Sequence, residues 1–267
     1  MEESYISTIR RLGPSKKLGQ SFLINPAIAQ TEANFGIDKR VIEMGPGLGI
    51  LTSALCKSAK EVLAVERDAR LYEILSQRLR LKNLTLINGD FFDVPRSTLS
   101  GYDIMISNIP YVLSSKVLLW LCREGMPALL CLQKEFVEHM LAQPGSRDYS
   151  KLSVMASLSM DATLVLDVPA GNFYPPPRVR SALVFLRPKR VSIDRATAGI
   201  ISAIMNHKKK KLRNAVHDSA AELGMGRDAA DEMAAGMPEA DRRLFQMGPK
   251  EILDVARHIK RGMGAGK

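Results

Sequence analysis

The sequence predicts a doubly wound α/β domain followed by a small helical domain. Through residue 135, short apolar runs alternate with stretches of helical periodicity, and the runs lack polar alternation, which is typical of parallel strands covered on both faces. From residue 191 onward no run resembles a strand, and Ala, Met, Lys, Arg and Glu dominate between Gly and Pro breaks. A chain of 267 residues can hold both parts. We therefore expect one domain over residues 1–190 and a helical domain over residues 191–267.

The individual elements follow from local signals. Asn25 and Pro26 are a typical N-cap and first residue of a helix, which Gly36 can end. Leucines four residues apart give the stretch 68–80 one apolar face. The expected strands are 41–44, 61–66, 84–87, 103–107 and 128–132, and the expected helices between them include 50–57, 68–80 and 114–123.

Two further strands, 163–168 and 181–187, come late in the expected first domain. The prolines of the stretch 173–177 make a stiff connector between them. Strands joined in this way are typical of an antiparallel addition at a sheet edge.

Composition narrows the class of protein. The chain carries 38 Lys and Arg residues against 28 Asp and Glu residues, a net charge of +10, which favours a polyanionic partner, nucleic acid first and a membrane surface second. The longest apolar run, 117–122, is far too short to span a membrane, and the N-terminus lacks the pattern of a secretory signal. Three cysteines without paired spacing fit a reducing cytoplasm, and the four histidines match no metal spacing. We expect a cytoplasmic protein with no metal site.

A glycine-rich turn stands where the first strand meets the next helix. Gly45, Gly47 and Gly49 form a G-x-G-x-G pattern that lets backbone N–H groups approach a ligand at a helix N-terminus. In the dinucleotide fingerprint a third glycine stands where this chain has Ile50. Taken alone, the turn fits a ligand loop and a purely structural turn equally well.

Polar side chains follow the next three strands. Glu66 ends the second strand and can accept both hydroxyls of a ribose, Asp90 follows the third and can accept from an adenine amino group, and Asn108 follows the fourth. Because the carboxyl ends of neighbouring parallel strands meet at one crevice, these residues indicate a ligand that carries adenosine. No pyrophosphate-binding lysine accompanies the glycines, which favours S-adenosyl-L-methionine over NAD or ATP.

The run Asn108-Ile109-Pro110-Tyr111 suits methyl transfer to an exocyclic amine. The lone pair of adenine N6 is delocalised into the ring, so two acceptors that bind its hydrogens, the Asn108 side-chain oxygen and the Ile109 carbonyl, would free it for attack. Pro110 fixes the backbone that holds this carbonyl, and Tyr111 offers a flat face for the base. We expect these four residues to be catalytic, mainly through positioning.

In this order the motifs resemble those of the KsgA-type rRNA adenine dimethyltransferases, more closely the archaeal and eukaryotic-type members. The resemblance covers essentially the whole chain and implies a Rossmann-like class I methyltransferase sheet with a small C-terminal helical domain. It implies that the chain dimethylates N6 of two adjacent adenosines near the 3′ end of small-subunit rRNA during ribosome biogenesis. The matching segments are 17–23, 43–49, Glu66, Asp90, 108–111, 149–154 and 173–179 with Ser181-Ala182.

The resemblance also implies roles for individual residues. It places Gln20, Ser21 and Leu23 over the methionine part of the cofactor, although relatives often carry Asn or His where Ser21 stands, so we expect this hydroxyl to reach the cofactor through water. It places Phe173 on the target base, opposite Tyr111. The complete implied cofactor set is Gln20, Ser21, Leu23, Gly45, Gly47, Glu66, Asp90 and Asn108.

Basic clusters flank the expected site. Lys208, Lys209, Lys210 and Lys211 follow one another, and Arg178 belongs to a second cluster in a stretch without acidic residues, 173–190. We expect both clusters to contact RNA phosphates, with a solvated helix face as the alternative for the lysines. Arg10, Arg11, Lys16 and Lys17 are a possible third cluster.

Two other functions fit part of these observations. The large-subunit rRNA adenine methylases of the macrolide-resistance type share the Asn-Ile-Pro-Tyr run, but the segment 149–154 and the basic helical C-terminus favour the small-subunit enzyme. An rRNA-binding assembly factor in which methylation is secondary is the other alternative. The expected partner is small-subunit rRNA in an assembling subunit, bound by a monomer and without a membrane.

Overall fold

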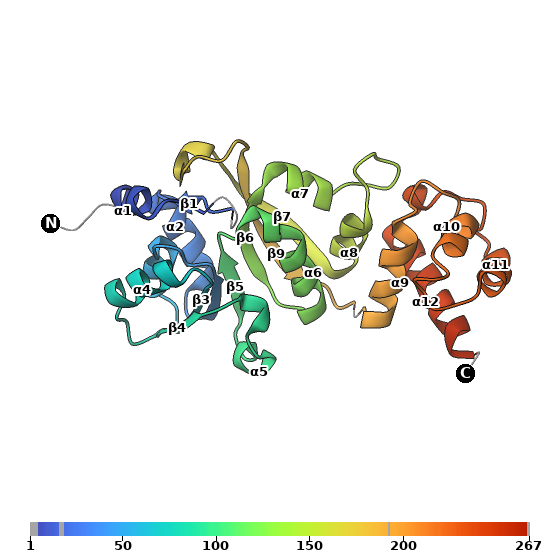
Figure 1. Ribbon diagram of the computed structural model, residues 1–267, viewed down its shortest axis with the longest axis horizontal. Coiled ribbons are helices and arrows are strands. Elements are labelled where there is room, and N and C mark those ends of the chain that lie inside the picture. Colours follow the sequence, from blue (N-terminus) through green and yellow to red (C-terminus); the bar gives the residue numbers. More distant parts are fainter. Residues whose placement is uncertain (1–4, 16–18, 192, 266–267) are drawn as a thin grey trace. The chain divides into compact units, whose positions relative to one another are not determined.

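The computed structural model describes residues 5–15, 19–191 and 193–265 (Figure 1). Lys16 and Lys17 of the third basic cluster lie outside the described residues. The chain forms two compact units: unit 1 comprises Met1–Val117, Met126–Val137 and Ala162–Arg187, and unit 2 comprises Leu118–Gly125, Glu138–Asp161 and Pro188–Lys267. Unit 2 thus takes in segments that precede residue 190, and a domain boundary at that residue stays a prediction. None of the described helices is long and apolar enough to cross a membrane.

Unit 1 is built on a seven-stranded sheet with the order β4-β3-β2-β5-β6-β9-β7. The first five strands in this order pair in parallel, and β9 pairs antiparallel with β6, which confirms the predicted doubly wound sheet and its antiparallel addition. The strands are β2 (Arg40–Met44), β3 (Glu61–Glu66), β4 (Leu84–Asn88), β5 (Ile104–Ser107), β6 (Ala128–Gln133), β7 (Met160–Val168) and β9 (Ser181–Pro188).

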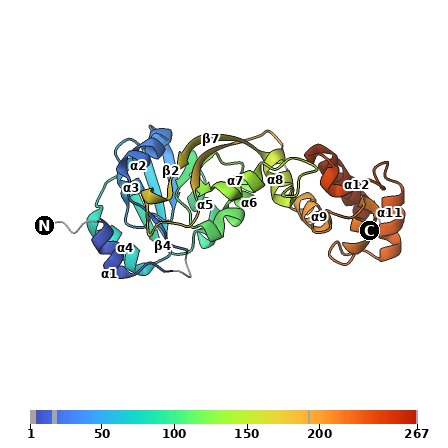
Figure 2. The ribbon, with the colours of Figure 1, turned by 90° about the horizontal axis from the view of Figure 1, so that it is seen from above.

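The central strands are mostly apolar because both faces of the sheet are covered. On one face, side chains of β2, β3, β5 and β6 pack in a single cluster with helices α2 (Pro26–Ala33) and α3 (Ile50–Leu55), which lie side by side (Figure 2). The next residues along the same strands, such as Ile42, Leu63 and Met105, are fully buried as well. Other helices that include unit 1 residues are α1 (Tyr5–Leu12), α4 (Ala69–Arg78), α5 (Arg96–Leu99), α6 (Ser114–Glu124) and α7 (Lys134–Met140).

The strand order places a crevice at the centre of the sheet. From β2 the chain runs outward through β3 to β4, then returns to β5 on the other side of β2. Loops that leave the carboxyl ends of β2 and β5 therefore diverge, and this switch point is where ligands bind in open α/β sheets.

A two-stranded sheet, which the sequence did not predict, lies beside this crevice. β1 (Phe22–Leu23) pairs antiparallel with β8 (Phe173–Tyr174), so the first two residues of the stretch expected as a connector form a strand. Two residues are too few to show any periodicity, so this pairing has no pattern in the sequence. The Tyr174–Pro175 peptide bond that follows is cis.

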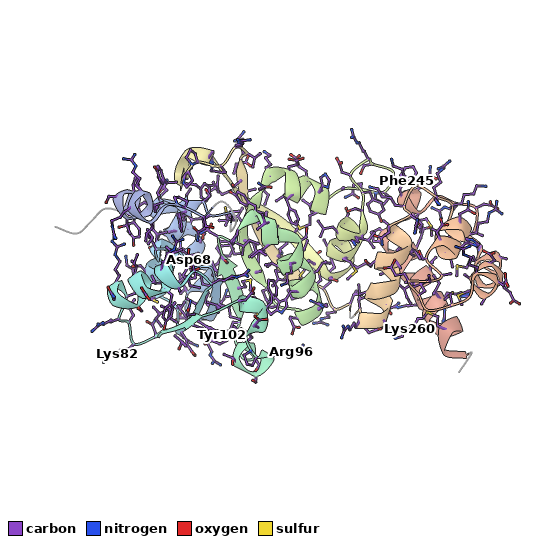
Figure 3. The ribbon with its side chains drawn as sticks, viewed as in Figure 1. Asp68, Lys82, Arg96, Tyr102, Phe245 and Lys260 are labelled. Atoms are coloured by element: carbon purple, nitrogen blue, oxygen red, sulfur yellow. The ribbon has the colours of Figure 1, made fainter. Side chains whose placement is uncertain are left out.

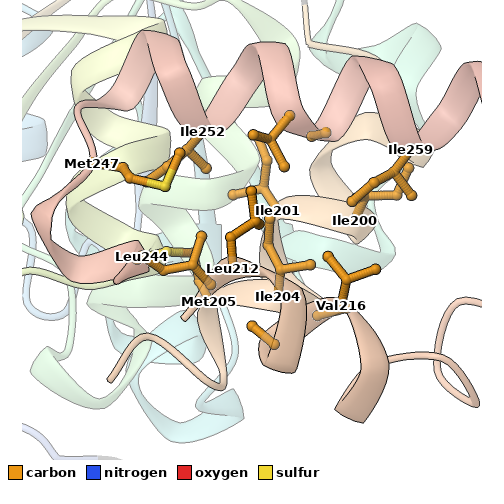
Figure 4. Packing of buried hydrophobic residues seen from close by; sticks show 14 of the residues in the cluster. Ile200, Ile201, Ile204, Met205, Leu212, Val216, Leu244, Met247, Ile252 and Ile259 are labelled. Atoms are coloured by element: carbon orange, nitrogen blue, oxygen red, sulfur yellow. The ribbon is translucent and has the colours of Figure 1, made fainter. Parts of the chain in front are cut away.

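The C-terminal part of unit 2 is helical, as predicted. Ile201 and Ile204 of α9 (Arg195–Met205) pack with Leu212, Leu244 and neighbouring residues in one buried cluster (Figure 4). The only described strand-like pairing after residue 191 is a single bridge between Lys211 and Arg243. The remaining helices are α8 (Lys151–Ser159), α10 (Leu212–Asp218), α11 (Arg227–Ala235) and α12 (Pro249–Ala265).

Candidate active site

A cavity in unit 1 lies at the switch point. It brings together every predicted cofactor and catalytic residue, together with Phe173. Arg178 and the four lysines are not among its lining residues, and the lysines belong to unit 2. The predicted residues in the lining are Gln20, Ser21, Leu23, Gly45, Gly47, Glu66, Asp90, Asn108, Ile109, Pro110, Tyr111 and Phe173.

The glycine loop needs glycine for two physical reasons. Gly45, Gly47 and Gly49 have φ angles of 71°, 60° and 83°, in the left-handed region that other residues rarely adopt. A Cβ on Gly47 would lie 2.9 Å from Cδ1 of Phe22, so the Phe22 ring would have to shift. The absence of a side chain at Gly47 therefore leaves space for Phe22 of β1.

Glu66 braces this loop from the end of β3. Its side chain is buried; Oε2 accepts from the Gly47 N–H at 3.0 Å and Oε1 accepts from the Asp68 N–H at 2.8 Å. Burial raises its pKa above the ordinary range, and the two backbone donors oppose this shift. Each carboxylate oxygen has a second lone pair, so the group can brace the loop and still accept from a ligand hydroxyl.

Gln20 and Ser21 are both bound within the protein. Gln20 accepts from the Ser15 N–H at 2.8 Å and donates from Nε2 to Oδ2 of Asp68 at 3.1 Å. Asp68, labelled in Figure 3, also binds Arg70, and these bonds lower its pKa to about 2. The Ser21 hydroxyl donates to the Pro175 carbonyl at 2.8 Å. Both residues therefore hold the chain around β1 against unit 1, and their cofactor contacts stay predictions.

Asp90 begins a short 3₁₀ turn after β4. Its Oδ1 accepts from the Phe92 N–H at 3.0 Å, and its Oδ2 lies 3.3 Å from Nη1 of Arg67. The carboxylate is thereby oriented at the cavity wall, where it retains acceptor capacity for an amino group.

Asn108 has one amide atom bound and the other free. Its Nδ2 donates to Oε2 of Glu32 at 2.9 Å, whereas its Oδ1 is buried without a hydrogen-bond partner among the described residues. An unpaired buried acceptor is costly, and in native proteins it points to a missing partner such as a ligand. This is the acceptor that the sequence assigns to the target amine.

Two buried carboxyl groups near the site are not among the predicted site residues, although Glu43 belongs to the matching segment 43–49. Glu32 on α2 is 1% exposed and Glu43 at the end of β2 is 2% exposed; burial raises the pKa of each to about 8. Glu43 lines the cavity, and its Oε2 has no described partner. A signal for Glu32 was available: it shares the apolar face of α2 with Ile28 and Ala29, where an unpartnered carboxyl is unfavourable.

The remaining residues shape the cavity wall. Ile109 and Phe173 are buried, at 2% and 4% exposure, and Phe173 is held by the β1–β8 pairing. The Tyr111 hydroxyl shares a 2.6 Å hydrogen bond with the Ser181 hydroxyl, which fixes its ring, and burial raises its pKa to about 12. Val112 is 71% exposed although it lines the cavity, an apolar surface that no sequence pattern predicts.

The lysine run is mostly bound within unit 2. Lys208 donates to the carbonyls of Arg147 and Tyr149 at 3.0 and 2.6 Å, Lys210 pairs with Asp218, and Lys211 lies 2.8 Å from an oxygen of Asp241. The Lys209 side chain is exposed and has no described partner. The RNA contacts expected of this run stay predictions, and three of its lysines also have a structural role.

Known proteins share this architecture. A crystal structure of a dimethyladenosine transferase from Plasmodium falciparum has a TM-score of 0.73 at 23% identity and covers 91% of this chain and 98% of its own. The crystal structure of the 23S rRNA methyltransferase ErmE has a TM-score of 0.59 at 22% identity, and the match covers 90% of this chain and 99% of that one. With its sheet order and glycine loop, the protein has the class I methyltransferase fold.

Sequence comparison identifies the family. Residues 14–233 match the family model described as ribosomal RNA adenine dimethylase. Proteins called probable ribosomal RNA small subunit methyltransferase A are similar to this chain over most of their length. The protein from Thermococcus kodakarensis is 37% identical, and the match covers 94% of this chain and 91% of that protein. The protein from Methanopyrus kandleri is 36% identical, and the match covers 98% of both chains. The chain belongs to the ribosomal RNA adenine dimethylase family and is a methyltransferase.

Proposed function

We propose that this protein uses S-adenosyl-L-methionine to dimethylate N6 of two adjacent adenosines near the 3′ end of small-subunit rRNA during ribosome biogenesis. The names of its archaeal relatives support the choice of subunit. The observation that carries the chemistry is the buried Oδ1 of Asn108, which has no hydrogen-bond partner in the described part of the chain and lies at the wall of a cavity lined by the glycine loop. The protein acts as a monomer in the cytoplasm, where subunits assemble.

The cavity suits the proposed cofactor. Bound there, S-adenosyl-L-methionine supplies an electrophilic methyl group on a sulfonium cation. The bare backbone of Gly45 and Gly47 admits the ligand, Glu66 accepts from the ribose hydroxyls, and Asp90 accepts from the adenine amino group. The buried carboxyl of Glu43, whose pKa burial raises to about 8, also lines the wall, and a bound cation would favour its ionised form.

The target adenine occupies the side of the cavity formed after β5. In the first transfer, Asn108 Oδ1 and the Ile109 carbonyl would accept hydrogen bonds from the two N6–H groups and leave the nitrogen lone pair free to attack the methyl carbon. The sulfonium sulfur would leave as a neutral thioether, and the cationic nitrogen would lose its proton to water. Pro110 restrains the backbone that carries this carbonyl. Tyr111, fixed through its hydroxyl, and Phe173 hold the faces of the extruded base, and stacking of about 1–3 kcal/mol per base offsets the cost of leaving the RNA helix.

RNA phosphates are bound by exposed cations outside the cavity. Arg178, between β8 and β9, and Lys209 are exposed, and no partner is described for either side chain. Phosphate contacts from such residues position the RNA without reading its sequence.

Incubation with labelled S-adenosyl-L-methionine and separate ribosomal subunits tests the proposal. Label in small-subunit rRNA, with dimethyladenosine at neighbouring positions after digestion, is expected. Label confined to the large subunit would favour the macrolide-resistance type of enzyme, which shares the fold at low identity. Tight RNA binding without label would favour an assembly factor.

A further inference from the structure

The amide of Asn108 is held in one of its two possible orientations. An asparagine side chain can be turned so that either its oxygen or its NH₂ group faces a given neighbour. Here Nδ2 donates to Oε2 of Glu32 at 2.9 Å, and Oδ1 remains an acceptor with no partner among the residues that the structure describes. Glu32 is not among the residues that line the cavity, and its hydrogen bond to the site is the one to Asn108.

The surroundings of Glu32 hold its carboxyl group in place. It lies on α2, whose start is set by the Asn25 cap and Pro26, and it packs beside Ile28 and Ala29 of the buried cluster. Its other oxygen, Oε1, is buried without a described partner. A carboxyl group placed in an apolar cluster with a single hydrogen bond is unfavourable for folding, which suggests that the bond serves another purpose.

We propose that Glu32 is a positioning residue for methyl transfer: by accepting from Nδ2 it keeps Asn108 turned with Oδ1 toward the target amine. This inference rests on the proposed function, in which Oδ1 accepts an N6 hydrogen. In the opposite orientation the NH₂ group of Asn108 would face the N6–H groups of the target adenine, and two sets of donors cannot form hydrogen bonds with each other. Glu32 therefore acts on the rate of transfer and not on RNA or cofactor affinity.

The ionised form of Glu32 is the one that selects the orientation. A carboxylate only accepts, whereas a protonated carboxyl can also donate to Oδ1 and stabilise the wrong orientation. Burial raises the pKa of Glu32, and the titratable groups facing it are Glu43 from β2 and Cys131 from β6. The single-turnover rate should therefore rise with pH as Glu32 ionises, and Glu32→Gln should abolish this rise.

The test compares Glu32→Leu, Glu32→Gln, Asn108→Ala and the double variant Glu32→Leu/Asn108→Ala. Gln30→Leu, on an exposed position of the same helix, is the matched control. We expect Glu32→Leu to lower kcat about 10- to 100-fold with unchanged RNA and cofactor affinity, because small errors of placement cost rates of this order. Glu32→Gln should recover part of the loss, and the double variant should equal Asn108→Ala.

The side-chain NH₂ signal of Asn108, assigned by its absence in Asn108→Ala, gives a readout without any turnover. In the wild type it should be protected from exchange, and in Glu32→Leu it should exchange fast. If Glu32→Leu fails to fold, the protection of this NH₂ group in the wild type and the pH profile of Glu32→Gln decide the question.

The outcomes separate the two proposals. Normal turnover by Asn108→Ala would overturn the proposed role of Oδ1 and this inference with it. Inactive Asn108→Ala beside a fully active Glu32→Leu, or losses that add in the double variant, would overturn the role of Glu32 alone. A pH dependence that Glu32→Gln retains would assign the titration to another group, such as Glu43, and would also contradict it.

Discussion

Replacing Glu66 with Gln tests how one carboxylate serves both the loop and the ligand. The side chain is 5% exposed and accepts from two backbone N–H groups, those of Gly47 and Asp68. Gln has nearly the same shape but one acceptor oxygen, so one buried N–H faces an NH₂ group. The unpaired donor costs about 1–3 kcal/mol, and the free energy of unfolding should fall by that amount.

The same change should weaken cofactor binding. Each hydrogen bond from a ribose hydroxyl to the charged group contributes about 1.5–3 kcal/mol, and the loss of one such bond corresponds to at least a tenfold weaker Kd. Calorimetric titration with S-adenosyl-L-methionine measures the affinity, and urea unfolding measures the stability. Glu61→Gln, at the opposite end of β3, is the matched control because Glu61 bonds Arg40 and Tyr102, away from the cavity.

The two readouts decide between roles. A drop in both is expected. A folded Glu66→Gln protein that binds the cofactor with wild-type affinity would refute the ribose assignment and leave Glu66 as a brace for the loop.

Three further predictions concern other parts of the chain. Asn108→Ala should bind RNA normally but transfer methyl at least about 100-fold more slowly in single turnover, and a rate within a few fold of wild type would rule out its role. Burial raises the pKa of Glu32 and of Glu43 to about 8, so between the ordinary glutamate pKa and about 8 the folded chain binds more protons than the unfolded chain. The free energy of unfolding, measured with urea, should accordingly fall as pH rises through that window, and the double variant Glu32→Gln/Glu43→Gln should show a weaker dependence on pH. An unchanged dependence in the double variant would mean that other groups cause it. Lys209→Ala should lower the salt dependence of RNA binding by about one released ion without loss of stability. Lys208→Ala should instead lower the melting temperature, because two carbonyls lose their donor. Equal effects of the two variants on both measurements would contradict this distinction.

The sheet and its switch point could be predicted from the sequence because they rest on patterns of many residues. Apolar runs without alternation predict β2, β3, β5 and β6, and glycines or polar residues directly after them predict which loops converge. The Asn25 cap is confirmed by its side-chain bond to the Ala27 N–H. Such local signals need no knowledge of distant partners.

Features that depend on a distant partner could not be predicted. β1 and β8 are two residues each and exist only because they meet. The lysine run reads as a free basic cluster, but Lys208 binds carbonyls about 60 positions earlier in the chain. The position of Glu32 beside Ile28 and Ala29 indicates that its carboxyl needs a partner, but only the fold shows that this partner is Asn108. In each case the deciding contact is tertiary.

The central claim is that this protein methylates neighbouring adenosines in small-subunit rRNA and that the residues after β5 position the target amine. Mass spectrometry of digested rRNA, after reaction of wild type and Asn108→Ala with unmethylated small subunits, tests it most directly. We predict dimethyladenosine at two adjacent positions near the 3′ end with the wild type and almost none with the variant. Only monomethyladenosine at long times, or dimethyladenosine formed equally by Asn108→Ala, would contradict the claim.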